Sequence, residues 1–389
     1  MNKVEAVVNK MIDRPYILNM GAGKLSSIFD CTRDEIYLAK MEARRIIRTV
    51  AKPKKEEEEN LELKSKWQNA KGDWLKSYKV KKEENDSLDP ADILQVIEKV
   101  FSNTDPIRID YKQFNTAKAL NIWITDEHIG ADTKNGLFDN DYDYEELQNR
   151  MDKILDEISK LAFMVGGFDQ INIGMLGDSF DGWDGETTRG GHKLPQSLDN
   201  RQAFTTFLTI YKSFIDSLVA LNLSNRIHFY FVANSNHGGD FDYIAYKTLE
   251  MYMQLVYPDI VVKIFEKFVN HFHYGVHTYI ITHGKDQENR KYGFPLVINE
   301  QTKGFINDYM KLNSMQPHVH FVKGDLHRSN LDLDRMCSSQ SSFTYQNVAS
   351  VFGASKWIMD NFGATMPIVD YEIVSKTDYR VLRGHIYLK

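Results

Sequence analysis

Hydrophobic residues recur at strand spacing and at helical spacing in separate parts of the chain. Beyond residue 118, short β-branched and aromatic runs alternate with longer amphipathic stretches, whose apolar residues stand three or four positions apart. The short runs predict strands at residues 122–124, 171–176, 227–232, 278–281 and 319–322. The amphipathic stretches predict helices at 147–165 and 203–218. Strands and helices in alternation predict an α/β domain whose strands run the same way.

The first 50 residues show helical spacing alone. It predicts helices within residues 4–11, 23–29 and 34–50. Thr32 and Glu35 have the spacing of a capping box that opens the third helix. Leu25, Ile28 and Phe29 are expected to pack against that helix. With a turn at 30–32, the last two helices resemble a helix-turn-helix.

The polar side of the third predicted helix is basic. Its positively charged residues are Arg33, Lys40, Arg44, Arg45 and Arg48. One interpretation is that they contact DNA phosphates. The other is a small helical bundle with a solvated charged face, and helix-turn-helix geometry also serves protein partners. Both interpretations stay open.

A segment dominated by charge follows the helical part. It contains the runs KPKKEEEE and KVKKEENDS and is typical of a linker or an exposed helix. Pro90 then opens a predicted helix that reaches Val100. Near the C-terminus, PIVDYEIV and YRVLRGHIYL predict antiparallel strands that close a second sheet. The predicted domains are a helical domain at 1–50, a charged linker with helical segments at 51–118 and an α/β domain at 119–389.

Composition excludes several classes of protein. Lys and Arg number 48 against 54 Asp and Glu, so a whole-chain polycation that coats nucleic acid is excluded and any basic contact surface must be local. Cys31 and Cys337 lie far apart, which disfavours a disulfide scaffold and a cysteine zinc site. No stretch approaches the ~18 apolar residues of a membrane span, and no signal peptide is recognisable. We expect a cytoplasmic protein that does not contact a membrane.

All five predicted strands are followed by residues of metal-ligand type. They are Asp126 and His128, Asp178 and Asp181, Asn236 and His237, His283, and Asp325 and His327. Parallel strands bring their carboxyl ends to one edge, so these side chains are expected to converge on one site. A single His or Asp at a strand end is most often a turn residue; five in order are not explained that way. Carboxylate, carboxamide and imidazole donors without thiolate suit a pair of divalent ions, Mn²⁺, Mg²⁺, Fe²⁺ or Zn²⁺.

The local spacing of two of these motifs supports convergence. Asp126 and His128, like Asp325 and His327, are alternate residues, which lie on the same side of an extended chain. Both members of each pair are therefore expected to reach one metal centre.

This ordered set resembles the motifs of the calcineurin-like metallophosphoesterases, namely DxH, GDxxD, GNH followed by an acid, a lone H, and GHxH. The resemblance covers roughly residues 119–330. Within that superfamily the chain is most similar to phage-encoded phosphoesterases, through the stretch WDGETTRGGHKLPQSLDN, and more distantly to the SbcD-type DNA nucleases. The resemblance implies a two-sheet β-sandwich flanked by helices.

The resemblance also implies roles for the residues of the motifs. Asp126, His128 and His327 would bind a first metal, Asp178 would bridge both metals, and Asn236, His283 and Asp325 would bind the second. His237, next to a ligand, would protonate the leaving oxygen.

The chain departs from the family pattern at two motifs. Asp325 stands where the family usually has His, which adds negative charge and favours Mn²⁺ or Mg²⁺ over Zn²⁺. The third motif has Ser235 instead of Gly, and Gly238 instead of the acid that often steadies the catalytic His. Asp240 or Asp181 could replace that support.

A long, Gly-rich polar insertion follows Asp181. Its residues Arg189, His192 and Lys193, together with Arg201, are candidates to hold phosphates, and Trp183 is a candidate to stack on a base. The alternative is a structural lid whose charges pair internally.

The function predicted from these features is a two-metal-dependent phosphodiesterase that cleaves DNA, a phage nuclease in replication or repair, with DNA and a replication or repair protein as partners. One alternative is a phosphatase or cyclic-nucleotide phosphodiesterase with a small substrate. Another is a DNA-binding scaffold whose metal site is structural.

Overall fold

The computed structural model describes most of the chain after residue 105 and shorter pieces before it. The described residues are 3–13, 22–32, 35–36, 39–40, 43, 61–68, 74–80, 90–101, 106–133, 142–286, 292–333, 343–353, 358–359 and 365–389. They form two compact units, Met1–Glu83 and Glu84–Lys389, which we describe separately.

The first unit begins with two helices, α1 (Lys3–Asp13) and α2 (Ala22–Phe29). In the third predicted helix, the described residues 35–36, 39–40 and 43 are helical. The capping box is confirmed, because the Thr32 amide donates to Glu35 Oε2 (2.8 Å) and the Glu35 amide donates to Thr32 Oγ1 (3.2 Å).

The three helical segments share a small apolar core. Its buried residues are Val7, Val8, Met11, Leu25, Cys31, Ile36, Ala39 and Ala43. The packing predicted for Leu25 is therefore confirmed. Ile28 is 55% exposed, so the packing predicted for that residue is wrong.

The charged segment contains an antiparallel hairpin where a linker or an exposed helix was predicted. Its strands are β1 (Leu61–Gln68) and β2 (Trp74–Val80), with Trp67 opposite Leu75. The sequence carries a signal for β1 that the abundance of charge obscures, because Leu61, Leu63 and Trp67 alternate with charged residues at the two-residue period of a strand.

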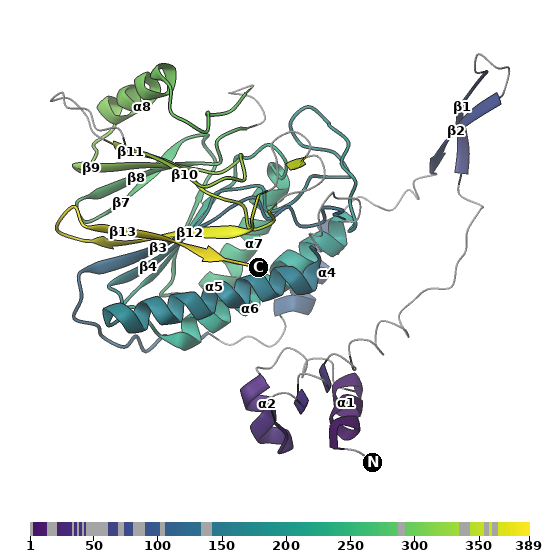
Figure 1. Ribbon diagram of the computed structural model, residues 1–389, viewed down its shortest axis with the longest axis horizontal. Helices are drawn as coiled ribbons and strands as arrows, with labels where there is room; N and C mark the ends of the chain where they lie inside the picture. Colours follow the sequence, from purple (N-terminus) through teal and green to yellow (C-terminus); the bar gives the residue numbers. More distant parts are fainter. Residues whose placement is uncertain are drawn as a thin grey trace. The chain divides into compact units, whose positions relative to one another are not determined.

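The second unit is a mixed α/β structure with two mixed sheets (Figure 1). The larger sheet has the strand order β13-β12-β3-β4-β5-β6. Its strands are β3 (Lys118–Ile124), β4 (Gln170–Met175), β5 (Ile227–Val232), β6 (Val261–Phe265), β12 (Ile368–Ser375) and β13 (Val381–Tyr387). Strands β3 to β6 are parallel, β12 is antiparallel to β3, and β13 is antiparallel to β12.

The smaller sheet has the order β10-β11-β9-β8-β7. Its strands are β7 (Asn270–Tyr274), β8 (His277–Thr282), β9 (His318–Lys323), β10 (Asn330–Leu333) and β11 (Phe343–Asn347). Strands β8, β9 and β11 are parallel, while β7 and β10 are antiparallel to their neighbours. The five strands predicted beyond residue 118 are confirmed as β3, β4, β5, β8 and β9, divided between the two sheets.

Side chains of β3 in the larger sheet alternate between two cores. On β3, Leu120 and Ile122 pack with the helices, whereas Ala119 and Trp123 share a cluster with Phe272 of the smaller sheet. Helices α5 (Tyr144–Val165), α6 (Asn200–Leu221) and α7 (Asp240–Val256) supply the first core. Helix α8 (Glu300–Leu312) packs against the smaller sheet, and α4 (Pro90–Phe101) lies beside α6. The helices predicted at 147–165 and 203–218 are thus confirmed as α5 and α6.

The two C-terminal strands lie in a different sheet from the one predicted. They were expected to close a second sheet, but they extend the larger one, with Tyr371 of β12 opposite Ile122 of β3. The physical reason is that β12 has buried residues on both faces. Val369 belongs to the core under the helices and Val374 to the core between the sheets, which suits an interior strand.

Helix α6 is long and apolar enough to cross a membrane by length and composition. The core helices of soluble proteins pass the same test. In this molecule α6 contacts both α5 and α7, and its apolar side, including Phe207 and Phe214, is buried.

Candidate metal centre

Buried acidic and histidine side chains gather at the carboxyl ends of strands from both sheets. Asp126 follows β3, Asp178 follows β4, His283 follows β8, and His327 lies in the turn after β9. Three groups of three have ligand atoms within 4.8 Å of one another: Asp126, His128 and His327; Asp126, Asp178 and His283; and His128, Asp181 and His237. These groups are positioned to hold a metal ion.

The imidazoles of His128 and His327 point their Nε2 atoms at each other. Each ring places Nδ1 against an acceptor, Asp181 Oδ1 at 3.0 Å for His128 and the Gly353 carbonyl at 2.8 Å for His327. Nδ1 of each ring is therefore the donor, and the lone-pair position of each ring is Nε2. The two Nε2 atoms are 3.1 Å apart, a spacing that only a shared proton or a cation makes favourable.

Protonation of this pair follows the neighbouring charges. Burial opposes a charge on His128, but the carboxylates of Asp126 and Asp181 outweigh it and raise the pKa of His128 well above its usual value. Burial and, to a smaller extent, His128 lower the pKa of His327 to about 4. One positive charge between the two rings is therefore favourable, and a divalent cation can supply it in place of a proton.

In the second group, His283 also places Nδ1 against a carbonyl oxygen and directs Nε2 toward other ligand candidates. Its Nδ1 donates to the Leu176 carbonyl at 3.0 Å, so Nε2 faces Asp178 Oδ2 at 3.0 Å and Asn236 Oδ1 at 3.1 Å. Burial opposes the charged ring, yet the carboxylates of Asp178 and Asp126 outweigh it and raise the pKa of His283 to about 9. Two oxygen acceptors and one imidazole nitrogen converge here as in a cation site.

Asp126 carries the clearest sign that a group is missing from the hydrogen-bond network. Its Oδ1 is fully buried and has no hydrogen-bond partner, although His327 Nε2 lies at 3.5 Å. Its Oδ2 accepts from Thr125 Oγ1 (2.8 Å) and the Asp325 amide (3.1 Å). Burial alone would raise its pKa, but His327 and His128 hold the pKa of Asp126 below its usual value. An ionised, buried and unpaired oxygen fits a metal ligand.

The backbone at the site differs from the extended geometry predicted for the alternate-residue motifs. Positive φ values occur at Asp126 (51°), His128 (46°), Asp178 (53°), Asp325 (75°) and His327 (55°). The prediction of extended pairs was therefore wrong, although His128 and His327 do meet. Left-handed backbone at residues other than glycine costs free energy and is kept where surrounding contacts fix it. Here the His128 amide donates to the Asp178 carbonyl at 3.1 Å.

The remaining ligand candidates lie around these three groups. Asp126 belongs to two of the groups, whereas the predicted bridge Asp178 belongs to one. Asn236 faces His283. Asp325 is partly buried, and its amide is bonded to Asp126.

His237 lies at the open side of the cluster. Its side chain is 23% exposed, and its ring stands edge-on to His128 at 4.7 Å. Nδ1 is 3.1 Å from the Asp181 carbonyl and 3.7 Å from Asp181 Oδ1, and the amide donates to Asp178 Oδ1 at 2.8 Å. Of the two acids proposed to support His237, Asp181 is its neighbour, while Asp240 is exposed at the start of α7.

Two supports of the cluster are absent from the sequence motifs. The first is the loop 350–353, which supplies the carbonyl for His327. Arg150 of α5 holds this loop by donating to the Val351 (2.6 Å) and Phe352 (2.9 Å) carbonyls. An arginine on the apolar side of a predicted helix was the only signal in the sequence.

The second support is Glu127, between the ligand candidates Asp126 and His128. It is fully buried and accepts from Ser179 Oγ (2.6 Å) and from the Tyr211 hydroxyl. Burial raises its pKa to about 7 in spite of these donors.

The insertion after β4 contacts the loop that carries His237. The Arg189 amide donates to the Asn236 carbonyl at 2.9 Å, and the Arg189 guanidinium pairs with Asp286 at 3.5 Å. Trp183 stands edge-on to Phe241 at 4.8 Å. Both side chains thus have partners within the protein. The other two candidates of this loop, His192 and Lys193, are exposed.

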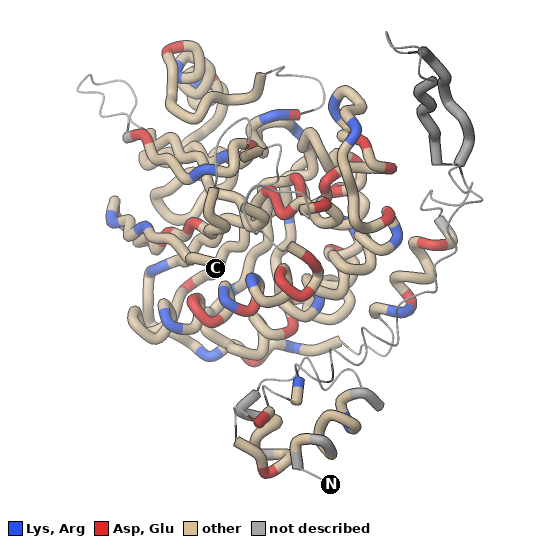
Figure 2. Tube along the Cα trace, turned by 45° about the vertical axis from the view of Figure 1, so that its right-hand side comes forward, with Lys and Arg blue, Asp and Glu red and all other residues tan. Residues whose placement is uncertain are grey.

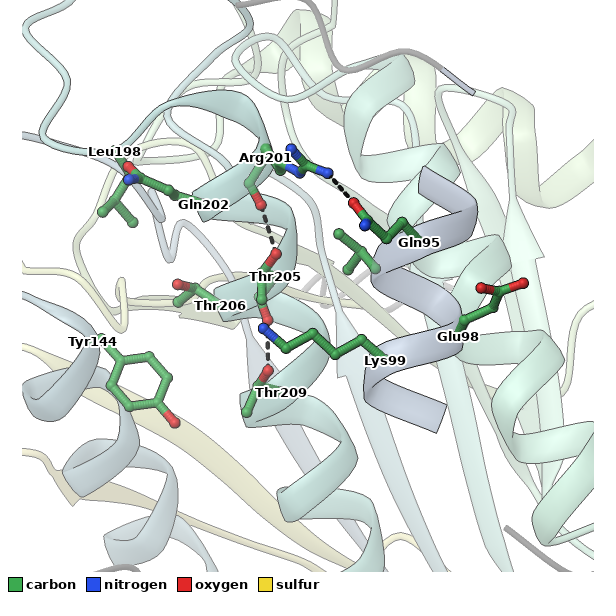
Figure 3. Close-up of a pocket in the computed structure, with 11 residues that line it drawn as sticks. Gln95, Glu98, Lys99, Tyr144, Leu198, Arg201, Gln202, Thr205, Thr206 and Thr209 are labelled. Atoms are coloured by element: carbon green, nitrogen blue, oxygen red, sulfur yellow. Dashed lines mark hydrogen bonds between the residues drawn. The ribbon is translucent and has the colours of Figure 1, made fainter. Parts of the chain in front are cut away.

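Arg201 faces away from this loop toward α4. It pairs with Asp92 at 2.6 Å and donates to Gln95 (Figure 3). Together with Lys99 and Thr205, it lines a pocket of about 1050 Å³ between α4 and α6. The structure does not bring Arg201 together with the metal-ligand candidates.

The five predicted DNA-contacting residues are described only in part. Lys40 lies in a helical segment and is half-buried. The remaining four, Arg33, Arg44, Arg45 and Arg48, lie outside the described residues.

A scan of the chain against protein-family models found no match, and a search of curated proteins found no significant match either.

Proposed function

We propose that the chain is a two-metal-dependent phosphodiesterase of the calcineurin-like metallophosphoesterase type, whose two sheets form the sandwich of that family. One observation carries the proposal. Ligand candidates from the ends of five strands face one another through imidazole nitrogens and carboxylate or carboxamide oxygens, including the 3.1 Å pair of Nε2 atoms in His128 and His327. A merely structural polar cluster would pair donors with acceptors instead.

The ligand candidates are divided between two cations in this proposal. Asp126, His128 and His327 hold one cation, and Asp126, Asp178 and His283 hold the other, with Asn236 and Asp325 beside it. When bound, two cations of this kind activate water and stabilise the negative charge that develops on a phosphoryl group. Manganese fits the oxygen and imidazole donors, with Mg²⁺, Fe²⁺ and Zn²⁺ as alternatives.

His237 supplies the proton for the leaving oxygen. Its Nδ1 is occupied by the Asp181 carbonyl, which leaves Nε2 of this partly exposed ring for proton delivery. The Asp181 carboxylate 3.7 Å away stabilises the imidazolium that donates the proton.

DNA is the substrate that we propose, in phage replication or repair. The resemblance to phage phosphoesterases and SbcD-type nucleases supports this choice, as does the helix-turn-helix pattern of the first unit, which we propose as the DNA-recognition module. In Figure 2 positive and negative residues are interspersed over the Glu84–Lys389 unit, so DNA attraction has to come from a local basic surface.

The test incubates the full chain and Mn²⁺ with labelled single- and double-stranded DNA, RNA, and bis-p-nitrophenyl and p-nitrophenyl phosphate. We expect DNA cleavage and slow hydrolysis of the small diester, with none by Asp178→Asn protein. Hydrolysis of the small substrates without cleavage of DNA would support the proposed phosphoesterase activity and contradict the proposed nuclease activity. No hydrolysis of any substrate with metal bound would overturn both.

A second experiment examines the recognition module. The full chain carrying Gln at residues 33, 40, 44, 45 and 48 should bind duplex DNA more weakly and hydrolyse the small diester as before. Each lost phosphate contact should reduce the salt slope of log K by about 0.9. An unchanged affinity and slope would make the first unit a protein-docking or structural element.

A further inference from the structure

Gly238 lacks a side chain because another residue occupies the space where one would be. Its φ lies outside the left-handed region, so the backbone there accepts any L-residue. A Cβ at residue 238 would lie 2.1 Å from Asp242 Oδ1, 2.3 Å from its Cγ and 2.5 Å from its Oδ2. The Asp242 carboxylate therefore occupies the space that a side chain at residue 238 would enter.

The Asp242 carboxylate cross-links two loops of the candidate metal centre. Its Oδ2 accepts from the Asp178 amide at 2.9 Å, and its Oδ1 accepts from the Phe180 amide at 3.4 Å, both in the loop after β4. Oδ2 also accepts from Ser235 Oγ at 2.7 Å, in the loop after β5. Asp242 is fully buried in the first turn of α7, so its place is fixed by the helix.

The second loop carries His237 and is tied back to the first. The His237 amide donates to Asp178 Oδ1 at 2.8 Å, and the Gly238 amide is 3.3 Å from the same atom. Ser235 Oγ accepts from the Gly239 amide at 3.0 Å while it donates to Asp242. The Ser235 hydroxyl thus belongs to a hydrogen-bonded unit centred on Asp242. The absence of a side chain at Gly238 leaves room for the carboxylate of that unit.

We propose that Asp242 is a positioning residue that fixes the positions of Asp178 and His237 relative to each other. Its carboxylate occupies the space that a side chain at residue 238 would otherwise fill. The proposal rests on the proposed function, since the two residues it positions are the ligand and the proton donor of that reaction. Asp242 touches neither substrate nor metal in this scheme. It acts through the amide of Asp178 and the hydroxyl of Ser235.

Four variants of the full chain test the position of the carboxylate. Asp242→Ala removes it, and Gly238→Asp adds a second one that overlaps the first. Gly238→Asp with Asp242→Ala returns one carboxylate from the other position, and Gly238→Ala with Asp242→Ala fills the space without a carboxylate. Circular dichroism and thermal melting establish that each protein is folded at the assay temperature.

Two readouts are measured for each variant: Mn²⁺ affinity by calorimetry, and kcat and KM for the small diester. We expect Asp242→Ala to weaken Mn²⁺ binding about 10–100-fold, as loss of support for metal ligands does elsewhere, and to lower kcat with little change in KM. Gly238→Asp alone should be impaired as well. The Gly238→Asp, Asp242→Ala protein should regain most of both quantities, and the matched Gly238→Ala, Asp242→Ala protein should not.

Equal defects in the two double variants, or wild-type Mn²⁺ affinity and kcat in Asp242→Ala protein, would overturn the positioning role. A lowered melting temperature with unchanged kcat and Mn²⁺ affinity would assign Asp242 to stability only. If wild-type protein binds Mn²⁺ but hydrolyses no phosphoester, the proposed function fails, while the affinities of the four variants still decide the role of Asp242.

Discussion

Two buried clusters of histidines in the second unit differ in how their hydrogen bonds are completed. The candidate metal centre lies at strand ends, in left-handed backbone, with like atoms facing one another. The second cluster, which we call the inter-sheet cluster, consists of His277 on β8, His320 on β9, and Glu372 and Arg383 on β12 and β13. Its four residues lie within regular strands.

The two histidines of the inter-sheet cluster lie in a chain of paired donors and acceptors. His277 Nε2 donates to the Ser375 (2.9 Å) and Asp378 (3.0 Å) carbonyls, so Nδ1 accepts from His320 Nε2 at 2.9 Å. His320 Nδ1 then accepts from Arg383 Nη2 at 3.2 Å. Both rings are neutral and fully paired. Burial, and then the positive charge of Arg383, lowers the pKa of His320 well below its usual value.

The comparison shows that gathered histidines do not by themselves indicate a metal site. The two clusters differ in whether their surroundings favour a positive charge on the histidines. His283 in the metal centre has a pKa raised to about 9 by carboxylates that outweigh burial, whereas His277 has a pKa lowered by burial. A cation would therefore stabilise the first cluster and disrupt the second.

Substitution of a metal-ligand candidate should have the largest effect. We expect Asp178→Asn and His128→Ala to lower diester hydrolysis by at least about 10³-fold, since cation charge contributes several kcal/mol to the transition state. Metal content, measured by mass spectrometry, should fall as well. The matched change in the other cluster, His277→Gln, should leave both quantities near wild type. Full activity of metal-depleted Asp178→Asn protein would contradict the two-metal proposal.

Substitution of His237 should separate chemistry from metal binding. His237→Ala should lose ~10²–10⁴-fold in kcat while it keeps its metal, because the two proposed cations are held by the groups that share Asp126, whereas His237 lies in the third group, with His128 and Asp181. The loss should shrink for substrates with good leaving groups, which need no proton. An equal loss with every leaving group would make His237 structural or a ligand.

Substitution in the inter-sheet cluster should change stability alone. His277→Leu leaves His320 Nε2 and two carbonyls without partners, and each buried unpaired group costs about 1–3 kcal/mol. Urea unfolding measures the loss, and Mn²⁺ affinity should stay unchanged. A fall in Mn²⁺ affinity comparable to that of His128→Ala would show that the two clusters are coupled.

The smallest expected effect is on the pH dependence of stability. Because the pKa of folded His320 lies well below its unfolded value near 6.5, the unfolded chain binds the extra proton first. The contribution of neutral His320 to the free energy of unfolding is fully present above pH 6.5. It is lost as the pH falls below that value, by up to about 1.4 kcal/mol per pH unit. Unfolding free energies of metal-free wild-type and His320→Gln protein should therefore converge as the pH falls from 6.5 to 5. Parallel curves would show that His320 titrates normally.

Local patterns were sufficient for the elements and for the candidate donors. Five apolar runs became strands, and the polar residues after them, such as Asp126 and His283, became the buried cluster, because strand period and strand ends depend on neighbours in sequence. The same patterns misassigned the C-terminal strands. The sheet to which β12 belongs depends on pairing with β3, nearly two thirds of the chain length away.

The sequence by itself therefore determined which residues offer metal-ligating atoms and in what order. Tertiary structure alone decided which atoms face one another: His128 meets His327 across 199 positions, Asp242 reaches the amide of Asp178 across 64, and His277 and His320 complete each other's hydrogen bonds. The physical reason is that charge demand at a buried group is set by its neighbours in space. A histidine in a motif and a histidine in a strand differ only once those neighbours are in place.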